Sequence, residues 1–360
     1  MLLLDLYLPE EYFLWSSVSK YFQIISNFKG MAATNESYSK YSDESKEKVK
    51  ILIIIGESHS RNFMSDKNSP WFSRMKHQKF FFDFPQTYAS YSHTVQVLSL
   101  ALSSGNQYLN RDLSFKSILS DDVILTRLLK NLGYTTIWIS NQEQTGVFGS
   151  PIALIGEECE YSYFSGDLKS SNVFGKPADE QILSKIPCPQ VHKTAIFLHL
   201  WGNHYPYAGG KFSDRKEFSA YEQSLRSVDD FLQKAFEKVQ KDKFDVVVYF
   251  SDHGEYPSYG TDGHNVQKLR KEMIHVPFWI YLSDAFAEKL PELSERLKNA
   301  QKQVITNDLI FNIICDILNI RGPKIQQGYN PLSDQYIINL DNAKTKYGKS
   351  LIKDLLDDKK

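Results

Sequence analysis

Short apolar runs alternate with helical patterns along most of the chain, from residue 50 to residue 318. Continuous apolar runs are typical of strands buried on both faces, and their alternation with helices indicates a largely parallel sheet. We therefore expect an α/β fold, a three-layer α/β/α sandwich with a mostly parallel central sheet. The predicted strands are Ile51–Ile55, Phe80–Phe84, Thr135–Ile139, Thr194–His199, Asp245–Phe250 and Val276–Leu282. The predicted helices are Thr94–Leu102, Asp122–Leu132, Ala178–Lys185, Glu217–Val239, Ala285–Leu297 and Asp308–Leu318.

The same pattern divides the chain into four segments. Residues 1–30 carry apolar residues at helical spacing, which fits an amphipathic helix that either lies on a membrane surface or packs against the domain that follows. Residues 31–49 are polar and charged and are typical of a linker. Residues 50–335 hold the alternating elements of the main domain, and residues 336–360 are rich in charge, so we expect a tail there.

The composition supports a large folded core and excludes some classes of function. Hydrophobic residues make up 42% of the chain and aromatic residues 14%, which argues against global disorder. The net charge is −1, from 42 Lys and Arg against 43 Asp and Glu, so the basic excess of a nucleic-acid-binding protein is missing. Three cysteines, Cys159, Cys188 and Cys315, lack metal-site spacing, and they form either one bridge between Cys159 and Cys188 or none.

No stretch of the sequence reaches the roughly 18–20 apolar residues that a membrane-spanning helix needs. The N-terminal sequence MLLLDLYLPEEYFLW has early acidic residues and no basic region before its apolar run. It therefore does not match a signal peptide.

Polar and ionisable residues follow the predicted strands at the edge where the carboxyl ends of parallel strands meet. Ligands bind beyond this edge in open α/β sheets. Glu57 follows the first apolar run, and a buried carboxylate there is costly unless positive charge lies close by. A metal ion would supply that charge, since zinc accepts oxygen and imidazole ligands of the kind found in this region: Glu57, His204, Asp252, His253 and His264.

Thr94 is the candidate nucleophile, because it begins a helical pattern within the sequence Ser92-His93-Thr94. The backbone N–H groups and the dipole of a helix N-terminus favour an anion such as a phosphate or an alkoxide. A metal ion that binds the hydroxyl lowers its pKa and makes it nucleophilic near neutral pH.

Each of these residues also has a structural explanation when it is taken alone. Thr94 fits a helix N-cap, Glu57 fits an ion pair with Arg61, and His264 fits a histidine of a glycine-rich surface loop. We assign His275 to structure and leave a ligand role open. The histidines to which we give no ligand role are His59, His77, His93 and His192. The functional interpretation is favoured because several such features occur together at one sheet edge.

Six motifs occur in the order seen in lipopolysaccharide phosphoethanolamine transferases, which belong to the sulfatase-like branch of the alkaline phosphatase superfamily. The motifs are IIIGESHSRNFMS, SYSHTVQVLSLALS, WISNQ, FLHLWGNHYPY, VVVYFSDHGEY and HVPFWIY. The chain resembles this family over about residues 50–320. The resemblance implies an alkaline phosphatase or sulfatase-like fold for the main domain, residues 50–335, and makes it the catalytic domain.

The resemblance also implies roles for single residues. Those that match the family's main zinc site are Glu57, Thr94, Asp252 and His253, with Thr94 as the nucleophile that becomes phosphoethanolaminylated. His204 and His264 match residues that bind substrate phosphate or a second zinc ion, and either one fits a proton donor and acceptor. Asn141 and Glu255 match positions near the phosphoethanolamine pocket, where a carboxylate holds the ammonium group. The expected cofactor is therefore one or two Zn²⁺ ions.

The implied reaction transfers phosphoethanolamine from phosphatidylethanolamine to lipopolysaccharide through a covalent threonine intermediate. The implied location is the periplasmic face of the inner membrane, with contact to the membrane surface, and we expect a monomer. Family members carry N-terminal transmembrane helices that this sequence lacks, which leaves a truncated product, a misassigned start or a peripherally docked domain as hypotheses. The competing functions are a phosphoglycerol transferase, a phosphodiesterase, a sulfatase or an inactive remnant. A sulfatase is disfavoured because residues 92–96 lack the C/S-x-P-x-R motif.

Overall fold

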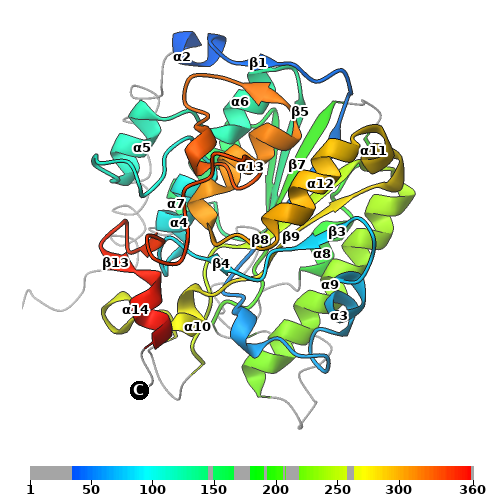
Figure 1. Cartoon of the computed structure of the whole chain (residues 1–360). Coiled ribbons are helices and arrows are strands. Elements are labelled where there is room, and N and C mark those ends of the chain that lie inside the picture. Colours follow the sequence, from blue (N-terminus) through cyan, green and yellow to red (C-terminus); the bar gives the residue numbers. More distant parts are fainter. Residues whose placement is uncertain are drawn as a thin grey trace, which may run out of the picture.

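The predicted α/β/α sandwich is confirmed in the part of the chain that the computed structural model describes (Figure 1). The described residues are 35–144, 149–165, 179–189, 193–205, 207, 219–257 and 263–357. The predicted amphipathic helix in residues 1–30 lies outside them.

The central sheet of the described residues has seven strands. In spatial order they are β3 (Phe81–Asp83), β9 (Phe278–Leu282), β8 (Val246–Ser251), β2 (Lys50–Gly56), β7 (Thr194–His199), β5 (Thr135–Ser140) and β6 (Tyr161–Phe164). Strand β9 runs antiparallel to both of its neighbours, and every other pair is parallel. The sheet is therefore mostly parallel, as the apolar runs predict.

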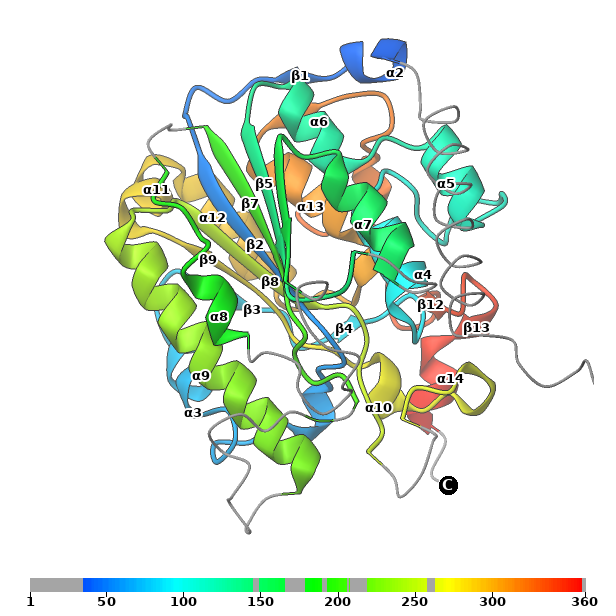
Figure 2. The same ribbon diagram turned by 180° about the vertical axis from the view of Figure 1, so that it is seen from behind.

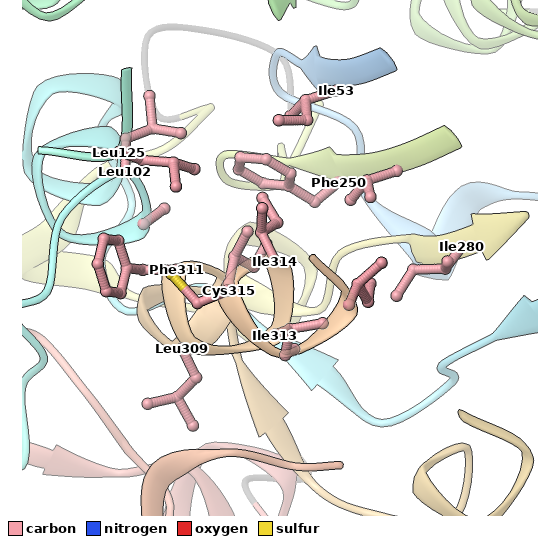
Figure 3. Close-up of a cluster of buried hydrophobic side chains, with 14 of the residues drawn as sticks. Ile53, Leu102, Leu125, Phe250, Ile280, Leu309, Phe311, Ile313, Ile314 and Cys315 are labelled. Carbon is pink, nitrogen blue, oxygen red and sulfur yellow. The ribbon is translucent and has the colours of Figure 1, made fainter. Parts of the chain in front are cut away.

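Successive residues of each strand point to opposite faces, so each face buries its own hydrophobic cluster. The helices that contribute at least two buried residues to the first cluster are α4 (Thr94–Ala101), α6 (Leu125–Asn131), α7 (Gly149–Glu157), α11 (Asp284–Lys289), α12 (Pro291–Ala300) and α13 (Ile310–Ile317). The other face is covered by α3 (Pro70–Met75), α8 (Glu180–Leu183) and α9 (Ala220–Lys241), as Figure 2 shows. Figure 3 shows how Ile314 of α13 lies against Phe250 on the first face.

The smaller elements of the described chain surround this sandwich. The short helices are α2 (Asn35–Ser39), α5 (Phe115–Asp121), α10 (Lys271–Ile274) and α14 (Ile352–Asp357), with 3₁₀ turns η1 (Arg61–Phe63), η3 (Val266–Lys268), η4 (Asn307–Leu309) and η5 (Gln327–Tyr329). Three pairs of two-residue strands complete them: β1 (Ser42–Asp43) with β11 (Ile320–Arg321), β4 (Thr87–Tyr88) with β10 (Ile305–Thr306), and β12 (Lys344–Thr345) with β13 (Ser350–Leu351).

One predicted helix needs correction, and one strand of the central sheet was missed. The single helix predicted over Ala285–Leu297 is two helices, because Pro291 cannot continue a helix and instead begins α12 at its first position. Strand β6 was not predicted, since it is an edge strand whose first residues, Tyr161 and Ser162, are exposed and give no buried apolar run.

Residues 35–49, which composition places in a linker, pack against the main domain in the structure. Strand β1 pairs with β11, and the side chains of Tyr38 and Tyr41 are buried. The ring of Tyr41 fills the space beside Gly322, where an added Cβ would lie 2.1 Å from it. The polar composition of this segment does not predict the packing, because only a few apolar side chains take part in it. The division of the chain into four segments stays a prediction.

The charged C-terminal segment also differs from a peripheral tail over its described part, residues 336–357. It forms the β12–β13 hairpin and α14, and it buries Ala343, Thr345 and Ile352.

None of the described helices combines the length and the apolar character that a membrane span requires. The three cysteines are unpaired, with Cys159 and Cys315 buried and Cys188 exposed, so the structure contains no bridge between Cys159 and Cys188.

We predict that Tyr41→Ala lowers the free energy of unfolding by about 3 kcal/mol, as expected for loss of a buried aromatic ring. The matched control is Tyr161→Ala in β6, because Tyr161 is 58% exposed and its loss should change stability by less than about 0.5 kcal/mol. Denaturant unfolding measures both. If both variants lose equally little free energy of unfolding, residues 35–49 behave as a linker after all.

Candidate active site

The register of two neighbouring strands brings the candidate metal ligands together. Gly56, the last residue of β2, lies opposite Ser251, the last residue of β8. The residues that follow, Glu57 on one side and Asp252 and His253 on the other, therefore emerge side by side. One ligand atom from each of these three residues lies within 4.8 Å of the others. All three side chains are buried.

The hydrogen bonds of this triad leave donor atoms for a cation. His253 Nδ1 lies 2.8 Å from the Gly254 carbonyl oxygen, so Nδ1 carries the proton and Nε2 has a free lone pair. That Nε2 lies 3.3 Å from Glu57 Oε1 and 3.5 Å from Asp252 Oδ2. Asp252 Oδ2 is buried and accepts no hydrogen bond from the described residues. Two carboxylates and one imidazole nitrogen that converge in this way fit zinc.

The pKa shifts of the triad show what happens without a cation. Burial, followed by the charge of Glu57, raises the pKa of Asp252 to about 7. Burial likewise raises the pKa of Glu57 and lowers that of His253. Two adjacent buried carboxylates oppose each other's ionisation, and a bound divalent ion would relieve this repulsion.

Thr94 lies at the edge of the triad. It is the first residue of α4, after the N-cap residue His93, so the alternative that Thr94 itself is the N-cap is wrong. Its hydroxyl donates a hydrogen bond to Glu57 Oε2 at 3.0 Å, and its Oγ1 lies 3.5 Å from His253 Nε2. The structure thus brings together the four residues predicted for the main metal site, whose roles in binding and catalysis stay predictions.

The structural alternatives for two neighbouring residues are decided by their contacts. Arg61 forms a two-point ion pair with Asp83, with distances of 2.9 and 2.5 Å, and does not pair with Glu57. His275 is held by Asn62 and by the carbonyl of Pro85, at 2.7 and 2.9 Å, in agreement with a structural role.

The buried turns that carry the triad are held by their own side chains. The backbone N–H groups of Ser58 and His253 both donate to Asp252 Oδ1, at 3.1 and 2.6 Å. Asn307 donates from its Nδ2 to the Asp252 carbonyl at 2.6 Å and accepts the Ser90 N–H at 2.9 Å. Asn307 therefore connects the turn that carries Asp252 to the segment that carries Thr94. Sequence analysis missed it, since no motif surrounds it.

A second group of polar side chains lies beside the triad. Glu255 accepts a hydrogen bond from His264 Nδ1 at 3.0 Å and from the Tyr207 hydroxyl at 3.1 Å. The ring of His264 lies 4.9 Å from that of His253, measured between centroids. Burial lowers the pKa of His264, but the hydrogen bond and charge of Glu255 outweigh it and the net pKa is raised. His264 therefore carries a proton more readily than an ordinary histidine.

Two further histidines face His264. The ring of His204 lies 6.4 Å from it and packs on Trp201 at 4.4 Å, and His204 Nδ1 hydrogen-bonds to the Tyr205 carbonyl. The ring of His93 lies 5.3 Å from His264 in an edge-on arrangement. Burial and the neighbouring imidazoles lower the pKa of His93 to about 4. Sequence analysis gave His93 no ligand role, and the structure places its ring in this cluster.

Asn141 contacts the site through other residues. Its Nδ2 donates to Asp179 Oδ1 at 2.8 Å, and its Oδ1 accepts from Ser165 at 2.5 Å. The Asp179 carboxylate in turn accepts the N–H groups of Trp201 and Gly202, at 2.8 and 2.9 Å. Asp179 follows no predicted strand and no motif contains it, so sequence analysis missed it. Contact between Asn141 and substrate stays a prediction.

Gly202 lies directly against the backbone of Glu57. Its φ of +55° is in the left-handed region, and a Cβ there would lie 2.8 Å from the Glu57 carbonyl oxygen. Only glycine fits at this position without moving Glu57. The turn that Asp179 holds thus sets the position of a candidate metal ligand.

Comparison with known proteins shows the family and the fold class of the chain. Residues 50–320 match the sulfatase family, and the chain belongs to that family. A protein of the alkaline phosphatase superfamily from Vibrio parahaemolyticus has the same fold, with a TM-score of 0.56 at 14% identity over 88% of this chain and 78% of that one. The fold class is therefore that of the superfamily to which the motifs point.

The relatives of the chain include several proteins named as phosphoethanolamine transferases, so the resemblance read from the motifs is confirmed. The chain is 25% identical to phosphoethanolamine transferase EptC of Escherichia coli O18:K1:H7 over 77% of its own length and 54% of that protein. It is 29% identical to phosphoethanolamine transferase OpgE of Escherichia coli K12, over 66% and 46% of the two chains. The chain thus spans about half the length of the curated relatives it matches.

A solved structure shows the same fold with a metal ion. The C-terminal periplasmic domain of EptC from Escherichia coli, in complex with zinc, has a TM-score of 0.73 at 18% identity, and the match covers 89% of this chain and 95% of that one.

We predict that Gly202→Ala lowers the affinity for zinc by about 10- to 100-fold, the usual effect of disturbing residues that orient a metal ligand. The matched control is Gly133→Ala, because Gly133 has a φ of +81° but no atom within 4 Å of the added Cβ. Both variants carry backbone strain, and only Gly202→Ala displaces Glu57. Competition with a chelator measures the affinity. Equal zinc affinity in the two variants would contradict this account of the Gly202 contact.

Proposed function

We propose that this chain is the catalytic part of a zinc-dependent phosphoethanolamine transferase. It moves phosphoethanolamine from phosphatidylethanolamine to lipopolysaccharide, on a core sugar or on lipid A, through a covalent intermediate on Thr94. The observation that carries the proposal is the hydrogen bond of 3.0 Å from the Thr94 hydroxyl to Glu57, within a buried triad that fits zinc. The names of the relatives support the reaction class.

Glu57, Asp252, His253 and the Thr94 hydroxyl would hold the zinc ion. When bound, zinc lowers the pKa of the hydroxyl and neutralises charge on the phosphoryl oxygens. One or two ions fit the proposal: with two, His204 and His264 would hold the second ion, and with one, these imidazoles are available for proton transfer.

In the first step, Thr94 Oγ1 transfers its proton to the Glu57 carboxylate, which already accepts its hydrogen bond. The new bond forms between Oγ1 and phosphorus, and the bond from phosphorus to the diacylglycerol oxygen breaks. The leaving oxygen takes a proton from an imidazole. His264 fits this role because Glu255 raises its pKa.

In the second step the same imidazole removes a proton from the acceptor hydroxyl or phosphate. The acceptor oxygen then attacks phosphorus, and the bond to Thr94 Oγ1 breaks as the oxygen regains its proton. Division of one transfer into two displacements is the usual logic of covalent catalysis. His204 is the second candidate for the proton transfer.

Two further residues, Glu255 and Asn141, complete the proposal. Glu255 is a buried carboxylate next to the imidazole cluster, and its charge attracts the ammonium group of the donor. Asn141 acts in the same region, through Asp179 in the present geometry.

We further propose a monomer that works on the membrane surface at the periplasmic face of the inner membrane, since solved neighbours are periplasmic domains.

The main competing function is transfer of phosphoglycerol, the reaction of a related Thr–zinc site. Glu255 favours the phosphoethanolamine donor, because a carboxylate attracts an ammonium group and gains nothing from a neutral glycerol. The comparison of two donors therefore separates the two functions.

We predict that the zinc-loaded protein, incubated with phosphatidylethanolamine, acquires a phosphoethanolamine adduct on Thr94, which peptide mass spectrometry locates. Thr94→Ala should form none, and Thr94→Ser, which keeps a hydroxyl, should form it more slowly. The parallel incubation uses phosphatidylglycerol. A phosphoglycerol adduct alone would favour the competing function, and the absence of both adducts from zinc-loaded, folded protein would contradict a threonine nucleophile.

A further inference from the structure

The C-terminal hairpin packs directly on the segment that carries Thr94. Strands β12 and β13 lie next to α4 in both views of the ribbon (Figures 1 and 2). The hairpin begins beyond residue 320, where the match to the sulfatase family ends. Its sequence is charged, and nothing in its pattern indicates contact with an active site.

Tyr347, in the turn of this hairpin, contacts the chain on both sides of Thr94. Its backbone N–H donates to the Ser90 carbonyl at 3.3 Å, and its hydroxyl donates to the Gln96 carbonyl at 3.2 Å. Its ring lies 5.0 Å from the ring of Tyr91. One side chain and its own N–H therefore connect the residues before the nucleophile to the first turn of the nucleophile's helix.

The turn that presents Tyr347 is strained. Lys346, Tyr347 and Gly348 have φ values of +53°, +56° and +81°, and two of these three residues carry a side chain in the left-handed region. Such a conformation persists only where surrounding contacts hold it, and it is found most often at functional sites.

Polar contacts on both flanks hold this turn in place. Thr345 Oγ1 donates to the Ala89 carbonyl at 3.0 Å. The Gln107 side chain donates to the Lys344 carbonyl at 2.8 Å and accepts the Gly348 N–H at 3.1 Å. Hydrogen bonds to the two segments that flank α4 thus hold the strained turn in place. Through the same bonds, the hairpin restrains both ends of that helix.

The contacts continue from Tyr347 into the imidazole cluster. The ring of Tyr91 lies 5.7 Å from that of His93, which in turn lies 5.3 Å from His264. Burial raises the pKa of the Tyr347 phenol above its ordinary value, so its hydroxyl keeps the proton that it donates to Gln96.

We propose that Tyr347 is a positioning residue for the nucleophile, and that the hairpin of residues 344–351 is needed to hold the active site in its reactive geometry. Tyr347 holds Thr94 Oγ1 at its distance from Glu57 by fixing the backbone at Ser90 and at Gln96. This inference rests on the proposed function, in which Thr94 attacks phosphorus. A small misplacement of a reacting group is enough to slow a displacement by one to two orders of magnitude, about 10- to 100-fold.

The test compares Tyr347→Ala, Tyr347→Phe and a matched control, Tyr134→Ala, by two measurements on the zinc-loaded full chain. Tyr134 is buried, whereas Tyr347 is partly buried, so the control removes the more buried ring of the two; Tyr134 precedes β5, at the amino end of that strand. Hydrogen exchange followed by mass spectrometry reports the mobility of residues 90–100 without any substrate. The initial rate of adduct formation on Thr94, at several concentrations of phosphatidylethanolamine, separates the maximal rate from the donor concentration at half that rate.

We expect Tyr347→Ala to speed hydrogen exchange in residues 90–100 by at least about tenfold and to lower the maximal rate of adduct formation by about 10- to 100-fold. The half-saturating donor concentration should change by less than about twofold. Tyr347→Phe keeps the ring contact with Tyr91. It should therefore show a smaller increase in hydrogen exchange and a smaller decrease in the maximal rate than Tyr347→Ala. Tyr134→Ala should lower the stability of the protein and leave both the exchange of residues 90–100 and the rate of adduct formation unchanged.

Three outcomes would overturn the inference. The first is unchanged exchange of residues 90–100 in Tyr347→Ala, and the second is an equal effect in Tyr134→Ala. The third is a loss confined to the half-saturating donor concentration, which would make Tyr347 a donor-binding residue. If Tyr347→Ala does not fold, Tyr347→Phe and Gln107→Ala provide the same comparison. If wild-type protein forms no adduct, the proposed function fails, and the exchange measurement alone decides whether Tyr347 anchors the segment.

Discussion

The structure depends on one electrostatic constraint, which is the burial of two carboxylates at the ends of adjacent parallel strands. The register of β2 and β8 places Glu57 next to Asp252, and neither side chain reaches solvent. Within the described residues the triad contains one imidazole, that of His253, and burial lowers its pKa. A divalent cation would satisfy this arrangement, because it would remove the repulsion between the carboxylates and use the free lone pair of His253.

The surrounding fold holds the atoms of this site from several directions. Asp179 fixes the turn at Gly202, which abuts the Glu57 backbone, and Asn307 connects the Asp252 turn to the segment before Thr94. The C-terminal hairpin reaches the same segment from the other side through Tyr347. Gly202 supports Glu57 by close packing, and the other supports are buried or partly buried hydrogen bonds, of which those from Asn307 to Ser90 and from Tyr347 to Gln96 join parts of the chain that are far apart in sequence. The precision of the site is therefore a property of the whole domain.

The parts of the fold that sequence analysis predicts are those with local causes. Apolar runs predict the buried strands, and the residues that follow β2 and β8 predict the metal triad, because the carboxyl ends of parallel strands must meet at one edge. The helix start at Thr94 is also local. In contrast, Asn307 contacts Ser90 across 217 positions of sequence, and Tyr347 contacts Gln96 across 251. No periodicity encodes such a contact, which is why these residues and the packing of Tyr41 appear only in the structure.

The most direct test of the central claim is diffraction from crystals of the zinc-soaked protein, with data collected on both sides of the zinc absorption edge. The account predicts an anomalous peak bounded by Glu57, Asp252 and His253, with Thr94 Oγ1 facing it. A second peak near His204 and His264 is compatible with the proposal. Absence of a peak at the triad, with zinc bound elsewhere on the molecule, would contradict the account, because the two buried carboxylates would then have no cation.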